Sequence, residues 1–465
     1  MAKKKQQQFV CTECGEQHSK WSGKCDSCGA WSTLVEFFES SMPKNPKSGQ
    51  GSELKFKSVQ ELASSKSKNK DRIKTGISDV DEVLGGGIVA ASVNLISGEP
   101  GIGKSTLIMQ IASAVANSDS DSDSKNQVLY VSGEESAEQV ASRASRLNLL
   151  DKSSTKDSET LGIVSSTSTD DIAATILKLK PTLAIIDSIQ TMACSEVNSA
   201  TGSVSQVTNS THILTQAAKS AGTALFIVGH VTKEGSLAGP KMLEHLVDVV
   251  LNLEGDRYGG FKILRAIKNR YGSTSEAGIF NMTDKGLEQV QNPSESLLAE
   301  RQVTDGSIVF AAMEGTRPLL VEVQALVNRT NFGYPKRASS GFDLNRLNLL
   351  VAVLTRRTKL NLNDFDIYIN VVGGIKLAEP AADLAVAMAI ASAAKGLSLN
   401  QDLAVAGELG LSGEIRRIPN LPKREAEAKK LGFKGLLAPK PDSKSNFIQE
   451  AKSLREVLNT WFTVK

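Results

Sequence analysis

Cysteine is scarce in this chain, and long apolar runs are absent. Only five of the 465 residues are cysteine. The longest apolar candidate, LAVAMAIASAA from Leu384, has the length of a buried helix and falls short of the ~20 residues of a membrane span. The sequence begins MAKKKQQQ, without the apolar segment of a secretory signal peptide. We therefore expect no membrane contact, a cytoplasmic location and reduced thiols.

Net charge is also small. The chain has 54 Lys and Arg against 51 Asp and Glu, a formal net charge of +3, which is too small to imply polyanion binding over the whole surface, so any nucleic-acid contact is expected from local patches. Residues 37–74 hold a local excess, nine basic residues against four acidic ones. Few large apolar residues accompany them, so residues 37–70 are predicted to form a basic flexible linker, either a plain tether or a DNA-contacting arm. The Ser/Asp/Lys-rich stretches 117–126 and 151–160 are expected to be loop insertions.

Four of the five cysteines form two C-x2-C pairs with ten residues between them. In a reducing compartment this spacing is typical of a tetrahedral zinc site, and two equivalent pairs favour one shared ion over a redox dithiol. His18 lies between the pairs as a competing ligand, but four sulfurs already complete the shell. The predicted zinc ligands are Cys11, Cys14, Cys25 and Cys28. Residues 1–36 are therefore predicted to be a zinc finger.

A nucleotide site is predicted where an apolar strand at 93–96 runs into GEPGIGKST and then into an apolar-periodic helix. Strand, G-x4-G-K-S loop and helix in this order are typical of a loop whose N–H groups surround phosphates. Lys104 is predicted to neutralise β- and γ-phosphate charge, Ser105 to bind Mg²⁺, and Thr106 to lie against the α-phosphate. The predicted ATP-binding residues are Gly98, Glu99, Pro100, Gly101, Ile102, Gly103, Lys104, Ser105 and Thr106.

Three further apolar runs end in polar residues. These runs are residues 127–136, 183–191 and 224–230. Because the carboxyl ends of parallel strands meet at one edge of a sheet, their polar ends are expected beside the nucleotide. Glu134, with Glu135 as the alternative, is predicted to polarise the attacking water, Asp187 to hold Mg²⁺, and His230 to sense the γ-phosphate. Spaced by helical segments, these strands predict an α/β ATPase with a parallel sheet.

Two cations follow another strand. LRAIKNRYG, at 264–272, places Lys268 and Arg270 two positions apart, so both side chains face the same side of the strand. Such cations can reach the γ-phosphate of a neighbouring subunit and stabilise the transition state. From the residues alone, a solvated strand end is an equally good interpretation.

The order of these motifs resembles the bacterial RadA (Sms) DNA-repair family. The four-cysteine segment, GEPGIGKST, IIDSIQ, GHVTKEG and KNRYG follow one another as in that family, with Tyr271 replacing the usual Phe. The resemblance implies a RecA-type motor over residues 71–290 that forms hexameric rings around single-stranded DNA. It further implies ATP-driven branch migration of branched recombination intermediates, with a RecA-type recombinase as partner. Residues 229–248 would be the DNA-contact loop.

In that loop Lys233 and Lys241 would contact DNA phosphates. The resemblance also favours Lys268 and Arg270 as catalytic residues that act on a neighbouring subunit or couple hydrolysis to DNA. Together with Lys104, Glu134 and Asp187, these two cations complete the predicted catalytic set.

Residues 291–465 resemble the proteolytic domain of Lon proteases. Ala381 follows Pro380 where those enzymes carry serine, and Pro422 stands at the lysine position with Lys423 beside it. Alanine has no oxygen to attack a carbonyl, so protease activity is not expected. An assembly and DNA-contact platform is predicted instead, with Arg356, Arg357, Arg416 and Arg417 as candidate phosphate contacts.

The expected fold class is thus α/β. It comprises a RecA-like P-loop ATPase core, an N-terminal zinc knuckle and a C-terminal Lon-protease-like α+β domain.

Overall fold

The chain folds into two compact units whose segments alternate along the sequence. The computed structural model describes residues 8–11, 17–27, 29–31, 33–37, 72–118, 126–147, 149, 160–230, 240–255, 260–331 and 333–461. Unit 1 comprises Met1–Glu254, Leu264–Thr274 and Met282–Glu288, and unit 2 comprises Gly255–Ile263, Ser275–Asn281 and Gln289–Lys465. The predicted division at residue 290 stays a prediction.

Several sequence expectations concern residues outside the described ranges. They are nearly all of the linker at 37–70, most of the insertions at 117–126 and 151–160, and the residues Cys14, Cys28 and Lys233. The backbone of Lys241 is described, but its side chain is not.

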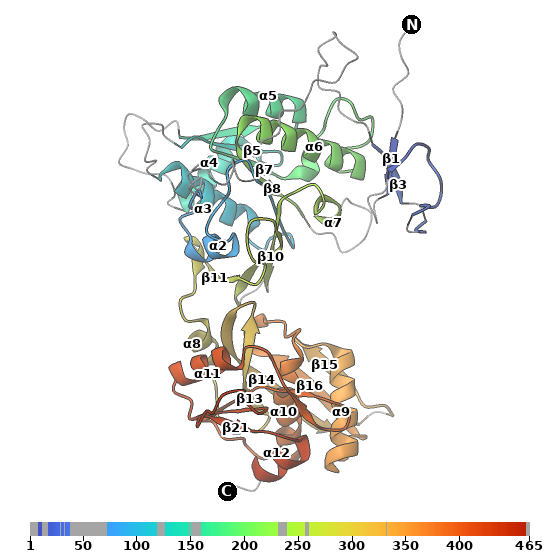
Figure 1. Ribbon diagram of the computed structural model, residues 1–465, viewed down its shortest axis with the longest axis vertical. Helices are drawn as coiled ribbons and strands as arrows, with labels where there is room; N and C mark the ends of the chain where they lie inside the picture. Colours follow the sequence, from blue (N-terminus) through green and yellow to red (C-terminus); the bar gives the residue numbers. More distant parts are fainter. Residues whose placement is uncertain are drawn as a thin grey trace, which may run out of the picture. The chain divides into compact units, whose positions relative to one another are not determined.

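A largely parallel sheet forms the centre of unit 1 (Figure 1). Its strand order is β12-β11-β10-β9-β4-β8-β7-β5-β6. The strands of its parallel part are β4 (Val93–Gly98), β5 (Val128–Ser132), β6 (Leu161–Ser165), β7 (Leu183–Asp187), β8 (Ala224–Val228) and β9 (Val249–Gly255). All residues of β4, β5 and β8 are buried, which explains their unbroken apolar sequences.

Helices cover this sheet. Alternate residues of β4, β5, β7 and β8 form one core with α5 (Thr169–Leu179) and α6 (Val204–Ala221). The phosphate-loop helix α3 (Lys104–Ala116) contacts β4, β5, β6 and β7. The shorter elements are α2 (Ser78–Val83), α4 (Ala137–Arg146), η1 (Ile189–Thr191) and α7 (Pro240–Leu243).

The sheet continues through β10 (Lys262–Asn269), β11 (Ala277–Thr283) and β12 (Gly286–Gln289). Gln110 of α3 donates to the carbonyl of Leu287 at 3.2 Å and accepts from its N–H at 3.0 Å. These two bonds fix β12 against the phosphate-loop helix.

The N-terminal module is a three-stranded antiparallel sheet. It consists of β1 (Gln8–Cys11), β2 (Gln17–His18) and β3 (Leu34–Phe37), in the order β2-β1-β3. Its described core contains only Cys11, Cys25 and Leu34, with Phe9 packed against them. A core of this size needs a further stabilising element, such as a metal.

Unit 2 is built on a seven-stranded mixed sheet in the order β15-β16-β14-β13-β17-β20-β21. Its strands are β13 (Ser307–Glu314), β14 (Arg317–Arg329), β15 (Arg337–Ser340), β16 (Phe365–Val371), β17 (Leu403–Val405), β20 (Gly435–Ala438) and β21 (Ile448–Glu450). A separate pair joins β18 (Glu408–Leu409) to β19 (Ile415–Arg416). Its helices are α8 (Pro293–Leu298), α9 (Leu344–Thr358), α10 (Asp383–Lys395), α11 (Leu421–Lys430) and α12 (Leu454–Trp461), with the short turns η2 (Val372–Gly374) and η3 (Pro380–Ala382).

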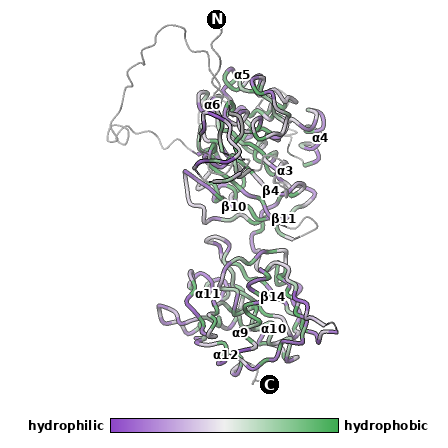
Figure 2. Tube along the Cα trace, turned by 90° about the vertical axis from the view of Figure 1, so that its right-hand side faces the viewer, coloured by the Kyte–Doolittle hydropathy of each residue, from purple (hydrophilic) through white to green (hydrophobic). Residues whose placement is uncertain are grey.

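The longest apolar run of the sequence lies in α10, which is labelled in Figure 2. Its residues from Asp383 to Ser392 are buried, and the apolar ones pack in the unit 2 core together with residues of α9, α11 and α12. Among the helices of the described ranges, none combines the length and apolar composition of a membrane span.

The two positions compared above with the Lon dyad have structural contacts in unit 2. Ala381 is buried in η3, and Lys423 donates to the carbonyl of Thr316 at 3.1 Å. The fully buried guanidinium of Arg424 instead binds both oxygens of Glu379 and the carbonyl of Ala311. An ion pair thus joins the chain before Ala381 to helix α11.

Candidate nucleotide site

The loop after β4 has a backbone that only glycine adopts easily. Gly98 and Gly103 have φ values of +155° and +113°, in the region that disfavours side chains. A Cβ on Gly98 would lie 2.4 Å from the carbonyl oxygen of Leu253, and one on Gly103 would lie 2.5 Å from Cε of Met282. Backbone conformation favours glycine at both positions, and packing against the Leu253 backbone also requires it at Gly98, as expected of a phosphate-binding loop.

Lys104 begins α3 with its ammonium turned back into this loop. Its Nζ donates to the carbonyls of Gly98 and Glu99, each at 2.9 Å, and the residue is 3% exposed. Burial lowers the pKa of Lys104 from 10.5 to about 8, although the carboxylates of Asp187 and Glu134 oppose the shift. A buried cation held only by carbonyls and distant carboxylates is suited to receive a phosphate anion.

The predicted acidic residues meet at the carboxyl edge of the sheet. At the end of β7, Asp187 accepts a hydrogen bond of 2.6 Å from the hydroxyl of buried Tyr130. Ser188 donates to Oε1 of Glu134 at 2.6 Å, and Nε2 of His230 lies 3.5 Å from the same oxygen. Burial and the charge of Asp187 raise the pKa of Tyr130 far above its ordinary value, so the phenol remains a donor. No pattern in the sequence marks Tyr130 or Ser188 as site residues.

Glu134 and Glu135 lie in different surroundings. Glu134 is half exposed and contacts Ser188 and His230, on the side of Lys104 and Asp187. Glu135 forms an ion pair with Arg143 of α4, and its N–H is bound by Ser132. The carboxylate of Glu135 is therefore occupied in holding α4, which favours Glu134 as the residue that polarises water.

We accordingly expect Glu134→Gln to lower the maximal rate of ATP hydrolysis by about 10²–10⁴-fold with little change in nucleotide affinity. The matched variant Glu135→Gln removes a partly exposed ion pair, worth about 0–1 kcal/mol, and should hydrolyse ATP at nearly the normal rate. Steady-state hydrolysis and binding of a fluorescent ATP analogue test both variants. A greater loss of hydrolysis in Glu135→Gln would reverse the assignment.

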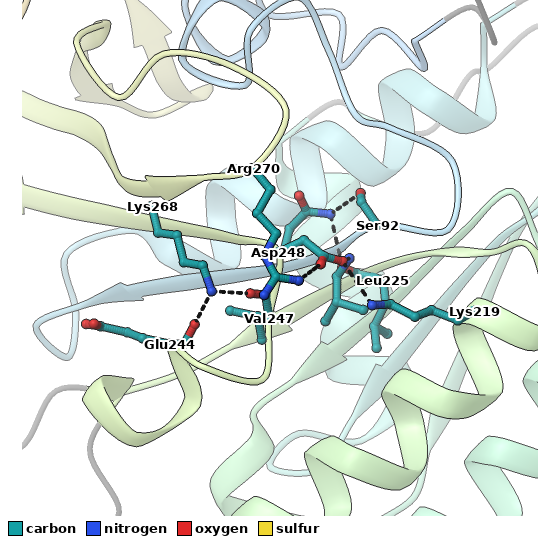
Figure 3. A network of polar contacts seen from close by, with 10 residues as sticks. Ser92, Lys219, Leu225, Glu244, Val247, Asp248, Lys268 and Arg270 are labelled. Carbon is teal, nitrogen blue, oxygen red and sulfur yellow. Dashed lines mark hydrogen bonds and ion pairs between the residues drawn. The ribbon is translucent and has the colours of Figure 1, made fainter. Parts of the chain in front are cut away.

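Lys268 and Arg270 lie at the other end of β4 (Figure 3). Asp248, which is 2% exposed, accepts from the N–H of Val93 at 3.0 Å and from Nη1 of Arg270 at 2.9 Å. Val93 is the first residue of β4 and Gly98 its last, so the Arg270 contact and the phosphate loop are separated by the length of the strand, roughly 16 Å.

The same network holds the segment before β9. Lys268 donates to the carbonyls of Glu244 and Val247 at 2.6 and 2.8 Å, and Lys219 of α6 lies 3.6 Å from Asp248 (Figure 3). Burial and the nearby charge of Arg270 lower the pKa of Lys268. Nothing in the sequence marks Lys219 as part of this network, and the one signal for Asp248 is its place as an acidic residue directly before a buried strand.

The described half of the zinc module places two thiols at its centre. Cys11 is 2% exposed and Cys25 fully buried, and Nε2 of His18 lies 3.4 Å from Sγ of Cys25. The described residues contain no group of three or more His, Cys, Asp or Glu side chains arranged to hold a metal. Two buried thiols at the centre of a module with so small a described core fit a structural zinc ion, with His18 beside Cys25, one of the predicted ligands.

Glycine loop, buried lysine and converging carboxylates on a parallel sheet define a P-loop ATPase. Three family models match the chain: an AAA domain over residues 60–236, the ChlI subunit of Mg-chelatase over 349–442, and a rubredoxin metal-binding domain over 9–36.

Curated relatives cover nearly the whole chain. DNA repair protein RadA of Halalkalibacterium halodurans is 47% identical over 94% of this chain and 93% of its own length. Those of Bacillus subtilis and Pseudomonas aeruginosa are each 46% identical over 94% of this chain, and over 93% and 94% of their own lengths. The chain therefore belongs to the RadA family of DNA repair proteins, which confirms the predicted family and fold class.

Proposed function

We propose that this DNA repair ATPase is a ring-forming motor that binds single-stranded DNA and drives branch migration of recombination intermediates. Six copies would form the ring, with ATP bound between neighbours and a RecA-type recombinase as partner. Lys233 and Lys241 would contact DNA phosphates from the loop at 229–248.

The observation that carries this proposal is the position of Lys268 and Arg270. In their own chain they contact Glu244, Val247 and Asp248, at the end of that loop, and lie a strand length from the phosphate loop. This position supports action on a neighbouring subunit's nucleotide. Two cations that share contacts with the DNA loop would couple nucleotide state to DNA contact.

The other site residues have separate roles in hydrolysis. Residues Gly98–Thr106 would hold the phosphates, and Ser105 and Asp187 would hold Mg²⁺, which neutralises phosphate charge when bound. Tyr130 would keep Asp187 oriented, since it donates to one carboxylate oxygen. Glu134 would orient the attacking water, and His230, 3.5 Å from Glu134, would relay γ-phosphate occupancy to the loop that follows it.

The N-terminal zinc module and unit 2 would serve binding and assembly. Four cysteines would close the coordination shell of Zn²⁺ and leave no position for catalysis. In unit 2 the methyl group of Ala381 cannot form an acyl intermediate, so this unit would assist assembly and DNA contact without proteolysis. Arg356, Arg357, Arg416 and Arg417 remain its candidate phosphate contacts.

Steady-state ATP hydrolysis with and without single-stranded DNA, over a salt series, tests the proposal. At a fixed DNA concentration, stimulation should fade as salt rises, because salt weakens DNA binding. For single strands, each neutralised phosphate contributes about −0.7 to the slope of the logarithm of the binding constant against the logarithm of the salt concentration. Lys268→Ala should still bind DNA and ATP but lose at least about 10-fold in stimulated turnover, since the coupling cation is gone.

The exposed Lys285→Ala supplies a matched control in the β11–β12 turn and should behave as the wild type. Turnover indifferent to DNA in the wild-type protein would contradict the motor proposal and favour a recombination scaffold. Stimulation that Lys268→Ala retains in full would remove Lys268 from the coupling.

A further inference from the structure

The N-terminal module exposes two tryptophans. The chain has three, Trp21, Trp31 and Trp461, and the first two are 62% and 73% exposed. Tryptophan is enriched at binding surfaces, because its large ring offers apolar contact area while its N–H can form a hydrogen bond. No part of the catalytic proposal uses these two side chains.

Trp31 is supported on one side and open on the other. Its backbone pairs with Lys24 in an antiparallel bridge, and the Lys24 ammonium lies 5.8 Å from the centre of its ring. A Cβ on Gly23 would lie 3.8 Å from Cζ3 of Trp31, so the ring lies along this backbone. The ring is thus held in place while most of its surface remains accessible.

Lysines accompany both tryptophans, since Lys24 lies beside the Trp31 ring and two lysines flank Trp21 in the sequence. Trp21 lies in the sequence KWSGK, so exposed Lys20 and Lys24 stand on either side of it along the chain. We call Lys20, Trp21, Lys24 and Trp31 the tryptophan surface.

We propose that the tryptophan surface binds single-stranded DNA by stacking two bases on its rings. Aromatic faces accept any base, and nearby lysines contact the phosphates between stacked bases. A protein partner fits less well. Tryptophan is enriched in the cores of protein interfaces, but lysine is depleted there, and two of the four residues of this surface are lysines. The inference rests on the proposed function for its choice of nucleic acid, but it uses residues separate from the ATPase site.

The small net charge of the N-terminal module determines how its DNA binding should depend on salt. Residues 1–36 contain five lysines and four acidic residues, a net charge of +1, so phosphate attraction alone is weak. Stacking therefore carries most of the affinity. Loss of a tryptophan ring should weaken DNA binding by the same factor at every salt concentration. Loss of Lys20 and Lys24 should reduce the slope of the logarithm of the binding constant against the logarithm of the salt concentration by roughly 1.4, at about 0.7 per phosphate contact.

The test uses the full-length protein and a fluorescein-labelled dT20 oligonucleotide, with anisotropy as the readout. Trp21→Ala/Trp31→Ala should raise the dissociation constant at least about 5-fold, the low end for one stacked base. Zinc content should stay at the wild-type level, and Trp461→Phe should bind as the wild type does. In the Trp461→Phe background, unlabelled dT20 should quench the fluorescence of the two remaining tryptophans.

An unchanged dissociation constant in the double variant would overturn the inference and assign the surface to a protein partner. If the double variant loses zinc, the quenching measurement decides alone, and unquenched fluorescence overturns the inference. ATP hydrolysis at saturating dT20 separates the two proposals. Stimulation in the double variant supports the motor whatever happens at the tryptophans, whereas absence of stimulation in the wild type contradicts the motor alone.

Discussion

Replacing Lys104 with methionine is expected to abolish ATP hydrolysis and, at the same time, to raise the thermal stability of the nucleotide-free protein. Hydrolysis should fall by at least about 10²–10³-fold, because the variant lacks the cation that faces the β- and γ-phosphates. Stability should rise because folding buries the ammonium group at 3% exposure, where it donates to the backbone carbonyls of Gly98 and Glu99 and forms no ion pair with a described carboxylate. Methionine fills a similar volume without this charge.

The difference in stability between the Lys104→Met variant and the wild type should depend on pH. The pKa of Lys104 is about 8 in the fold and 10.5 ordinarily, so between these values the unfolded chain binds more protons than the folded one. The free energy of unfolding of the wild type therefore gains a rising contribution from pH 8 to 10.5, which the methionine variant lacks. The melting temperature of the variant should exceed that of the wild type by several degrees at pH 7 and by much less near pH 10.

Differential scanning calorimetry at both pH values, without nucleotide, measures this difference, and Lys285→Met serves as the exposed control. A variant that melts below the wild type at pH 7 would show that the ammonium stabilises the empty loop. Saturating ATP should reverse the order, since it stabilises only a protein that binds it.

The second large effect is expected from Cys25→Ser. Cys25 is fully buried in the small core of the N-terminal module, and structural zinc contributes on the order of 10–16 kcal/mol to such modules. Loss of one thiolate should unfold the first thirty-six residues and release the metal. ATP binding should remain intact, because this core shares no residue with the core that the parallel sheet of unit 1 forms with α5 and α6.

Zinc content by mass spectrometry, amide exchange over β1–β3 and ATP affinity test this variant together. Cys194→Ser is the matched control, since its buried thiol contacts Gln206 of α6 and, among the described cysteines, it forms no disulfide. Failure of Cys25→Ser to bind ATP would contradict an independent module.

Sequence alone predicted those parts of the site that depend on neighbours along the chain. The phosphate loop follows from one strand, a glycine pattern and one helix, and Asp187 and His230 follow from strand ends. Contacts between distant segments could not be predicted. Tyr130 meets Asp187 across 57 positions, and Val93 meets Asp248 across 155. No local period encodes such pairs, because strand order in the sheet creates them.

The same reason explains the choice between Glu134 and Glu135. The two carboxylates are adjacent in sequence and equivalent by pattern. Only the fold distinguishes them, since Arg143 of α4 approaches Glu135 while Ser188 and His230 approach Glu134.

Because segments of the two units alternate along the chain, a gene divided near codon 291 would not encode a complete unit 2. A fragment that begins at residue 291 would lack Phe261, Ile263, Ala277 and Ile279, all buried in the unit 2 core. The unit 2 core of this fragment would contain cavities in place of these four apolar side chains. In the N-terminal fragment the same four side chains would be exposed to water. The Lon-like half therefore cannot be exchanged between proteins by a single crossover: to be inherited in working form, it must travel with strands of the ATPase.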